Sequence, residues 1–204
     1  TIGIIVPHIL NSMYMEIAKG VEDVALQKDY ITFIGNGEMN ARTEEEYLKQ
    51  LELRRVDGII TIFTSMDEEK LKALEGNGVP VVLIGENKKI DGISTVRVDC
   101  KSGAERMVGH LIGSGHKKIA ILHGKEPEKE SNDIYEGYCN MLKANGLEYS
   151  EDLVAQVDNS IEGGYLGAKK MLLSDKPDAI FATSDEIAYG AMDALKDAGV
   201  RIPE

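Results

Sequence analysis

The chain has 204 residues, of which 43% are hydrophobic and 28% are charged, a balance that is ordinary for a globular protein with its own core. Its formal net charge of −12 argues against direct binding of DNA or RNA by these residues, because an acidic surface repels phosphate backbones. No apolar run approaches the ~20 residues that a membrane-spanning helix needs. Two cysteines do not make a disulfide framework, so we expect reduced thiols and a cytoplasmic protein.

Short aliphatic and β-branched runs recur along the chain and are bounded by Gly, Pro, Asn or Asp. Such runs are typical of strands that are buried on both faces of a parallel sheet. They predict strands at 2–6, 31–34, 58–62, 79–84, 95–98, 118–122, 153–157 and 179–182. Between most of them, apolar residues at helical spacing predict helices at 14–28, 43–54, 67–76, 103–114, 132–145, 162–173 and 186–198.

The alternation of strands and helices indicates an α/β fold made of βαβ units with right-handed crossovers. Five predicted strands precede residue 99 and three follow it. The strand at 95–98 has no helix directly before it, so we expect an edge strand that leads from one sheet to the next. Two parallel sheets, in domains 1–98 and 99–204, therefore fit better than one sheet of eight strands.

No motif in the sequence commits the chain to catalysis, a metal or a cofactor. No glycine-rich phosphate loop follows a strand, no serine lies in a G-x-S-x-G turn, and the four histidines match no zinc spacing. His116 is expected to be structural, whereas His123 follows a predicted strand and could face a cleft. The acidic runs 44–46 and 126–130 are expected to be solvated faces or loops. We expect a protein that is not an enzyme and that uses no cofactor.

One candidate binding segment follows the first predicted strand. Ligands of doubly wound sheets bind at the carboxyl ends of the strands, and segment 8–14 lies at such an end. Asn11 or Ser12 can cap the helix that begins there. His8, Met13 and Tyr14, the last two expected at the exposed start of the helix, fit either a wall of a ligand cleft or local packing.

A second candidate, Ser184-Asp185, follows the last predicted strand at the start of a helix. A side-chain oxygen at this position can accept hydrogen bonds from the first backbone N–H groups of the helix. We therefore expect Asp185 to be partly structural, as a helix cap, and otherwise part of a ligand-binding wall.

Several short segments occur in a specific order along the whole chain. They are IGIIVP (2–7) with Asn11, RRVDGII (54–60), GVPVVLI (78–84), Val98-Asp99 with Gly103-Ala104, His110-Leu111 with GHKKIA (115–120), Gly137-Tyr138, and the stretch 184–204 that ends in AGVRIPE. In this order they resemble the effector-binding domain of the LacI/GalR family of bacterial transcription regulators. No single segment is decisive, but their joint order is highly specific.

The resemblance implies a periplasmic-binding-protein-like type I fold of two Rossmann-like lobes that cross near Val98-Asp99. A small-molecule effector would bind between the lobes, and lobe closure would shift a homodimer that positions DNA-binding headpieces. By the same standard, the headpiece would precede Thr1 and the end of the second lobe would follow Glu204. Operator DNA would thus be contacted only through the missing headpiece, and no membrane is involved.

The residues expected to contact the ligand depart from the family pattern. His8 stands where the family commonly has Asp, Ile134 where it has Arg, and Asn159 where it has an aromatic residue. Gly85, followed by Glu86, replaces another common Asp. The full set of expected ligand residues is His8, Asn11, Met13, Tyr14, Glu86, Asn132, Ile134, Asp158, Asn159, Ser184 and Asp185.

Three readings of these departures stay open. In the first, the effector is not a typical hexose. In the second, a protein partner has replaced ligand control. In the third, the usual contacts are replaced by acceptor and amide groups such as Asn132, Asp133, Asp158, Asn159 and Glu86. A rival from another class is an extracytoplasmic solute-binding protein, which shares the fold and differs by a signal peptide in place of a headpiece.

The stripes Tyr47-Leu48-Leu51 and Leu71-Leu74 fit either the core or a dimer interface.

Overall fold

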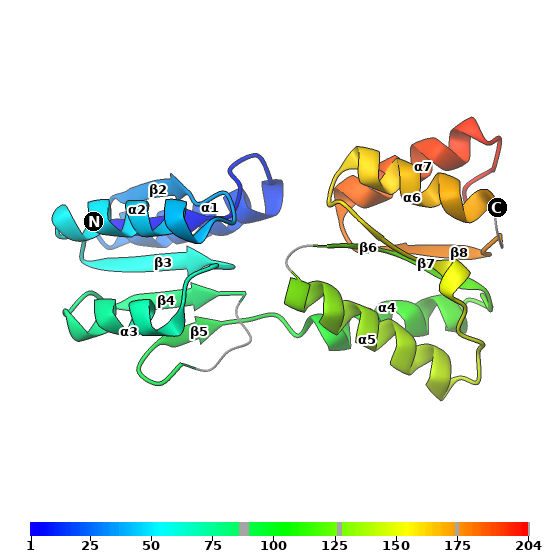
Figure 1. Cartoon of the computed structure of the whole chain (residues 1–204), viewed down its shortest axis with the longest axis horizontal. Helices are drawn as coiled ribbons and strands as arrows, with labels where there is room; N and C mark the ends of the chain where they lie inside the picture. The colour runs from blue at the N-terminus through cyan, green and yellow to red at the C-terminus, as the bar shows by residue number, and fades with distance from the viewer. Residues whose placement is uncertain (86–89, 126–127, 174–175, 204) are drawn as a thin grey trace. The chain divides into compact units, whose positions relative to one another are not determined.

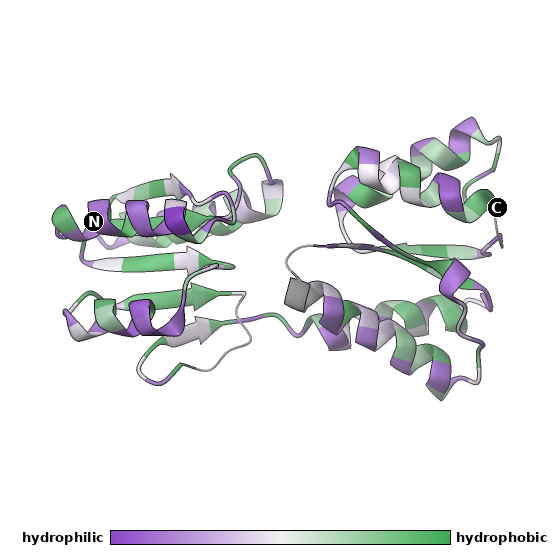
Figure 2. Cartoon of the chain, viewed as in Figure 1, coloured by the Kyte–Doolittle hydropathy of each residue, from purple (hydrophilic) through white to green (hydrophobic). Residues whose placement is uncertain are grey.

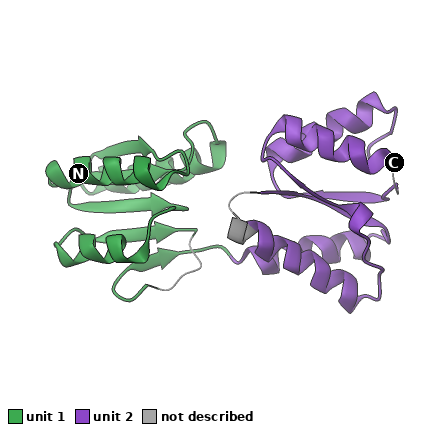
Figure 3. Ribbon diagram, in the orientation of Figure 1, with its two compact units in different colours: residues 1–98 green, residues 99–204 purple. Residues whose placement is uncertain are grey.

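The computed structural model describes residues 1–85, 90–125, 128–173 and 176–203, with backbone only for 128–130. The chain divides into two compact units, Thr1–Val98 and Asp99–Glu204 (Figure 3). Both units are of the α/β class, as the sequence predicts, and each is described by itself.

The first unit contains a five-stranded parallel sheet in the order β2-β1-β3-β4-β5. Its strands are β1 (Ile2–Val6), β2 (Thr32–Asn36), β3 (Gly58–Ile62), β4 (Val81–Ile84) and β5 (Ser94–Val96). Its helices are α1 (Ser12–Gln27), α2 (Ala41–Leu53) and α3 (Glu68–Gly76) (Figure 1). The segment at β5 is an edge strand, which confirms the prediction for 95–98.

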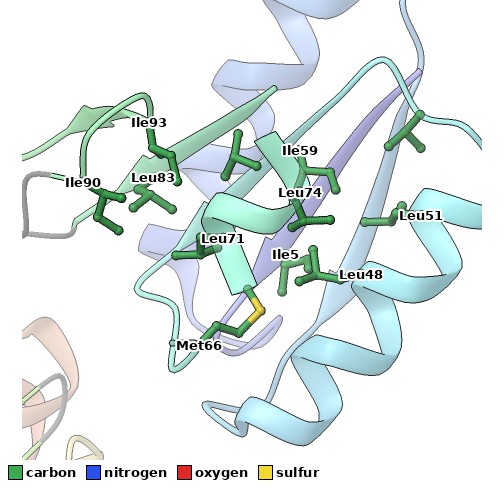
Figure 4. Packing of buried hydrophobic residues seen from close by; sticks show 12 residues of the cluster. Ile5, Leu48, Leu51, Ile59, Met66, Leu71, Leu74, Leu83, Ile90 and Ile93 are labelled. Atoms are coloured by element: carbon green, nitrogen blue, oxygen red, sulfur yellow. The ribbon is translucent and has the colours of Figure 1, made fainter. Parts of the chain in front are cut away.

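Alternate residues of the strands build a core on each face of this sheet. On one face, Ile5, Ile59 and Leu83 pack with leucines of α2 and α3 (Figure 4). These four leucines, Leu48, Leu51, Leu71 and Leu74, belong to the stripes that fit core or interface, and all four are buried within the unit. Tyr47, the remaining residue of the stripes, is 37% exposed. On the other face, Ile4, Val6 and Ile62 pack with Tyr14 and Ala18 of α1.

The second unit contains a three-stranded parallel sheet in the order β7-β6-β8. Its elements are α4 (Cys100–Gly113), β6 (Ile119–Gly124), α5 (Glu128–Ala144), a 3₁₀ turn (Glu151–Leu153), β7 (Val154–Val157), α6 (Ile161–Leu173), β8 (Ala179–Ala182) and α7 (Asp185–Asp197). Every residue of the central strand β6 is buried. Figure 2 shows the apolar strands and the mixed polar and apolar colouring of the helices.

Two helix pairs complete the core of the second unit. Ile119 and Ile121 belong to a cluster with Val108 of α4 and Tyr138 and Leu142 of α5. The intervening residues Ala120 and Leu122 belong to a cluster with α6 and α7. The direction in which each β6 side chain points thus assigns one helix pair to each face.

Helices α6 and α7 approach each other through glycines. A Cβ atom placed on Gly190 would overlap the carbonyl oxygen of Ile161, and one on Gly164 would overlap the carbonyl oxygen of Ile187. Only hydrogen fits at these two positions, because the neighbouring atoms are backbone and cannot rotate away.

The predicted strands and helices all appear, with shifts at their ends. The largest shift is at α5, which begins at Glu128 rather than at residue 132. Of the two alternatives expected for 126–130, a solvated face or a loop, the helical backbone of 128–130 excludes a loop there; residues 126–127 lie outside the described residues. β6 continues to Gly124, two residues beyond its predicted end, because it is buried between both helix pairs.

Candidate functional site

The strand orders indicate a candidate ligand-binding edge in each unit. In an open parallel sheet, ligands bind outside the carboxyl ends of the strands where the strand order reverses. In the first unit this reversal lies between β1 and β3, since β1 pairs with both β2 and β3. In the second unit it lies between β6 and β8. We call the loops at these strand ends the first edge (7–11, 37–40 and 63–67) and the second edge (125, 158–160 and 183–184).

Two polar side chains of the first edge shape the loop after β1. Asn11 is the N-cap of α1, and its Oδ1 accepts hydrogen bonds from the backbone nitrogens of Met13 at 3.1 Å and Tyr14 at 3.4 Å. Asn11 thus takes the cap role for which Ser12 was the alternative. The exposed His8 ring accepts a hydrogen bond at Nδ1 from the backbone nitrogen of Leu10 at 3.3 Å. The side chain of Met13 is 49% exposed at the same edge.

Tyr14 corrects one expectation about this loop. The prediction that its side chain stands at the exposed start of the helix is wrong, since Tyr14 is only 5% exposed. Its ring packs against that of Phe63, with ring centroids 5.7 Å apart, and joins the core beneath α1. The physical reason is that a large ring on the sheet-facing side of a helix gains more from burial than from contact with water.

The loop after β3 is held by a buried carboxylate. Glu44 in the first turn of α2 is 2% exposed, so the prediction that it belongs to a solvated acidic face is wrong. Its carboxylate accepts hydrogen bonds from the hydroxyl of Thr64 and from the backbone nitrogen of Ser65, the latter at 3.1 Å. These bonds compensate the burial of the charge and tie α2 to the first edge.

The structure gives a reason for the glycine that replaces a common Asp of the family. Gly85, directly after β4, has a φ of +87°, and a Cβ on it would overlap the ring of Phe63. Phe63 itself has a φ of 45°, in the left-handed region that side chains other than glycine rarely adopt. The aromatic ring thus fills the space of a side chain at position 85. Glu86, the predicted ligand residue that follows, lies outside the described residues.

At the second edge, polar side chains from different strand ends are paired. Lys125 Nζ, after β6, lies 2.9 Å from Asp158 Oδ1, after β7. The hydroxyl of Ser184, after β8, donates a hydrogen bond of 2.5 Å to Asn159 Oδ1. The structure therefore brings together the predicted residues Asp158, Asn159 and Ser184, and adds Lys125. Sequence reasoning missed Lys125, because the predicted strand ends at residue 122 and only the observed end of β6 at Gly124 places Lys125 directly after a strand.

The start of α7 corrects the role of Asp185. Ser184 is the N-cap, with its Oγ accepting a hydrogen bond from the backbone nitrogen of Ile187 at 3.3 Å. The expectation that Asp185 caps the helix is therefore wrong. Asp185 is the exposed first residue of α7, where its negative charge favours the helix dipole without a cap bond.

The predicted ligand residues of α5 lie in different surroundings. Asn132 is exposed, whereas Ile134 is half-buried and packs against the cluster around Tyr138 and Leu142. His123, which could have faced a cleft, is instead 6% exposed inside the unit, and burial lowers its pKa. Its Nδ1 lies 2.8 Å from the Oγ of Ser131.

Two further properties concern the described part of the chain as a whole. Among the described residues, no group of three or more His, Cys, Asp or Glu side chains is arranged to hold a metal ion. Within the same ranges, no helix is long and apolar enough to cross a membrane.

The chain is similar to known proteins along its whole length. The family model described as periplasmic binding proteins and sugar binding domain of LacI family matches residues 1–204. Catabolite control protein A of Staphylococcus xylosus is 36% identical over 203 residues, which are 100% of this chain and 61% of that protein. The same-named protein of Staphylococcus aureus is 35% identical and is covered to 62%. The chain thus spans about three fifths of the length of these curated relatives.

Solved structures agree with this relationship. The transcription regulator CcpA of Lactococcus lactis has 30% sequence identity and a TM-score of 0.85, with 99% of this chain and 74% of that chain covered. A LacI family transcriptional regulator of Enterococcus faecium with bound ribose has 29% identity and a TM-score of 0.85, with 100% and 74% covered. The fold and the sequence lead to the same conclusion: the chain belongs to the family of periplasmic binding proteins and LacI-type sugar-binding domains.

Proposed function

We propose that the chain is the ligand-sensing part of a LacI-type transcriptional regulator, which binds a small effector and does no chemistry on it. The observation that carries the proposal is the match of the whole chain to this family, together with curated relatives that are catabolite control proteins. Support comes from the two edges, where neutral and charged polar groups gather at the carboxyl ends of parallel strands.

The proposed contacts come from both edges. In the first unit they are His8, Asn11 and Met13, together with Glu86, which lies outside the described residues; Tyr14, buried in the core, is no longer proposed. In the second unit they are Asn132, Ile134, Asp158, Asn159, Ser184 and Asp185, with Lys125 added by the structure. The internal bonds of Asn159 and Ser184 orient both groups before a ligand arrives, which lowers the entropic cost of binding.

We take the effector to be a sugar or another small polar metabolite. The Enterococcus faecium relative was solved with ribose, which makes ribose a reasonable first compound to test. Amide groups and carboxylates suit hydroxyl-rich ligands, because each hydroxyl both donates and accepts a hydrogen bond. Lys125 neutralises part of the acidic charge at the second edge, so an acidic group on the ligand is tolerated there.

The proposal includes a homodimer, a cytoplasmic location and control of operator DNA. DNA contact is assigned to protein outside these 204 residues, because the chain carries a net charge of −12. The effector controls DNA binding only if it binds one conformation of the regulator more tightly than another, and a hundredfold difference corresponds to about 2.7 kcal/mol.

A solute-binding protein of a transporter is the other function that the family description covers. The curated relatives point to the regulator, since they are catabolite control proteins. We therefore keep the regulator as the proposal.

A thermal-shift screen of the 204-residue chain tests effector binding. The compounds are sugars, sugar phosphates, nucleosides, purines and amino acids, each added well above the expected dissociation constant. A compound that binds only the folded chain raises the melting temperature by mass action. We expect one chemical class to stand out, and a screen without any stabilising compound would count against the proposal.

Variants localise the ligand to the second edge. Asn159→Ala should weaken or abolish the shift given by the best compound, because it removes the side chain bonded to Ser184. Asn140→Ala is the matched control, since Asn140 is an exposed amide on α5 with a 3.4 Å contact to Glu105. An equal loss in both variants would mean that the ligand does not bind at the second edge.

A further inference from the structure

A buried polar connection links the carboxyl end of β6 to the start of α5. His123 and Ser131 are 6% and 5% exposed, and His123 Nδ1 lies 2.8 Å from Ser131 Oγ. Ser131 also donates its hydroxyl proton to the carbonyl oxygen of Gly124. The connection thus joins the end of β6, just before Lys125, to the first turn of α5, just before Asn132.

The hydrogen-bond pattern assigns the proton on the histidine. A serine hydroxyl has one proton, and Ser131 gives it to Gly124. The oxygen of Ser131 can then only accept from His123, so Nδ1 of the imidazole must carry hydrogen. Burial lowers the pKa of His123, which favours the neutral ring with its single hydrogen on Nδ1.

The histidine ring is also fixed by aromatic packing. It stacks on Tyr135, with ring centroids 5.4 Å apart and an angle of 14° between the rings. Ser131 and Tyr135 are four residues apart, so they lie on the same face of α5. Two successive turns of α5 therefore hold one imidazole ring from both its edge and its face.

The same end of β6 contacts the other loops of the second edge. The backbone nitrogen of Gly124 donates to Thr183 Oγ1 at 3.2 Å, and that of Lys125 donates to the carbonyl oxygen of Val157 at 3.0 Å. The residues that follow Val157 and Thr183 are the proposed ligand residues Asp158 and Ser184. The two residues that follow His123 thus bond to the ends of the other two strands, so a shift of His123 would be passed to all three loops of this edge.

We propose that His123 is a positioning residue: its Nδ1–H bond to Ser131 holds the first turns of α5 against β6 and so presents Asn132 and Lys125 at the second edge. This inference rests on the proposed function for the meaning of that edge. The four residues that precede His123 in β6 are Ile119, Ala120, Ile121 and Leu122. Burying a polar ring at the end of such a strand costs free energy unless the ring is hydrogen-bonded. We assign the bond to Ser131 the further role of fixing the start of α5 relative to the end of β6.

The deciding measurement is amide hydrogen exchange of the 204-residue chain and its variants, resolved along α5. His123→Leu and Ser131→Ala each remove the bond, and we expect exchange in the first turns of α5 to rise about tenfold, as for the loss of one buried hydrogen bond. His123→Asn places an amide nitrogen near the position of Nδ1 and should restore slow exchange. The double variant His123→Leu/Ser131→Ala should exchange no faster than Ser131→Ala alone, because Ser131→Ala already lacks the bond to His123 as well as the bond to Gly124.

Tyr138→Phe is the matched control. It removes a buried bond of 2.8 Å between α5 and the other end of β6, from the Tyr138 hydroxyl to the carbonyl oxygen of Ile119. We expect this variant to lose overall stability without selective exchange in the first turns of α5. Equal exchange across all of α5 in His123→Leu, unchanged exchange, or no rescue by Asn would each overturn the assignment.

A binding measurement separates this inference from the proposed function. With the best compound of the thermal-shift screen, or with ribose if none stands out, His123→Leu should bind about tenfold more weakly and His123→Asn nearly as well as the parent chain. If no compound binds the parent chain, the proposed function fails while the exchange result still decides the role of His123. If binding persists unchanged in His123→Leu, the positioning role is wrong and the proposed function stands.

Discussion

The two edges use polar side chains in different ways. At the first edge, His8 and Asn11 each bond to backbone within their own loop. At the second edge, Lys125–Asp158 and Ser184–Asn159 join residues that follow different strands. The first edge is held by bonds to backbone and by the buried carboxylate of Glu44, which joins α2 to the loop after β3, whereas the second is held by side-chain pairs between different loops.

The largest expected effect comes from breaking the helix pair under the second edge. Gly190→Ala places a methyl group on the carbonyl oxygen of Ile161, so we expect a loss of about 3 kcal/mol or more in the free energy of unfolding. Gly20→Ala is the control, because Gly20 lies inside α1 and a Cβ added there would meet no atom within 4 Å. It should stabilise by about 0.5–1 kcal/mol. Urea unfolding measures both, and similar values for the two variants would contradict the close contact.

Removing the Glu44 carboxylate should damage the first edge by a smaller amount. In Glu44→Ala, the hydroxyl of Thr64 and the backbone nitrogen of Ser65 lose their acceptor, so we expect a loss of about 2 kcal/mol. Hydrogen exchange should rise in the loop after β3 and leave the second unit unchanged. Glu46→Ala is the control on the same helix, since Glu46 is 66% exposed and pairs with the exposed Arg42. Equal losses in both variants would rule out the special role of Glu44.

The buried imidazole of the second unit should give stability a pH dependence. Because burial lowers the pKa of His123, the folded chain binds this proton less readily than the unfolded chain. The stabilising contribution is full above the unfolded pKa of about 6.5 and is lost as the pH falls toward the folded pKa, with a slope of at most about 1.4 kcal/mol per pH unit. The stability difference between the parent chain and His123→Asn should shrink between pH 7.5 and pH 5. A constant difference would contradict this.

The smallest effect on stability is expected for the charged pair of the second edge. Lys125 and Asp158 are 55% and 75% exposed, so Lys125→Met should cost less than about 1 kcal/mol. Lys101→Met removes a comparable exposed pair with Glu136 on the helices α4 and α5 and should cost as little. Only Lys125→Met should alter effector binding. An equal change in binding for both variants would show a general charge effect in place of a local one.

Most of the fold could be predicted because its strands are apolar runs with clear ends. β1 and β6 are buried on both faces, which leaves a continuous apolar signal in the sequence. The edge position of β5 followed from the lack of a preceding helix. The start of α5 was placed too late, because the polar residues 128–130 give no apolar period to extend the helix.

The candidate site was harder to predict because it depends on partners that are distant in sequence. Glu44 is buried by Thr64 and Ser65, which are 20 and 21 residues away, so its acidic surroundings in sequence suggested a solvated face. Lys125 meets Asp158 across 33 residues. His123 was visible as a residue after a strand, but only its bond to Ser131 shows that it points inward. The apolar runs of the sequence show where the strands end, but they do not show which side chains at those ends bond to one another.

The glycine contact between α6 and α7 has a consequence for how the second unit can move. Packed helices usually adjust to each other by changing side-chain rotamers, but Gly164 and Gly190 have none to change. We therefore expect α6 and α7 to move as one unit, without sliding past each other. Asn159 precedes α6 and Ser184 begins α7, so this shared shift would carry both ends of their hydrogen bond in the same direction. We expect a ligand that binds Asn159 or Ser184, as proposed, to move the two helices together.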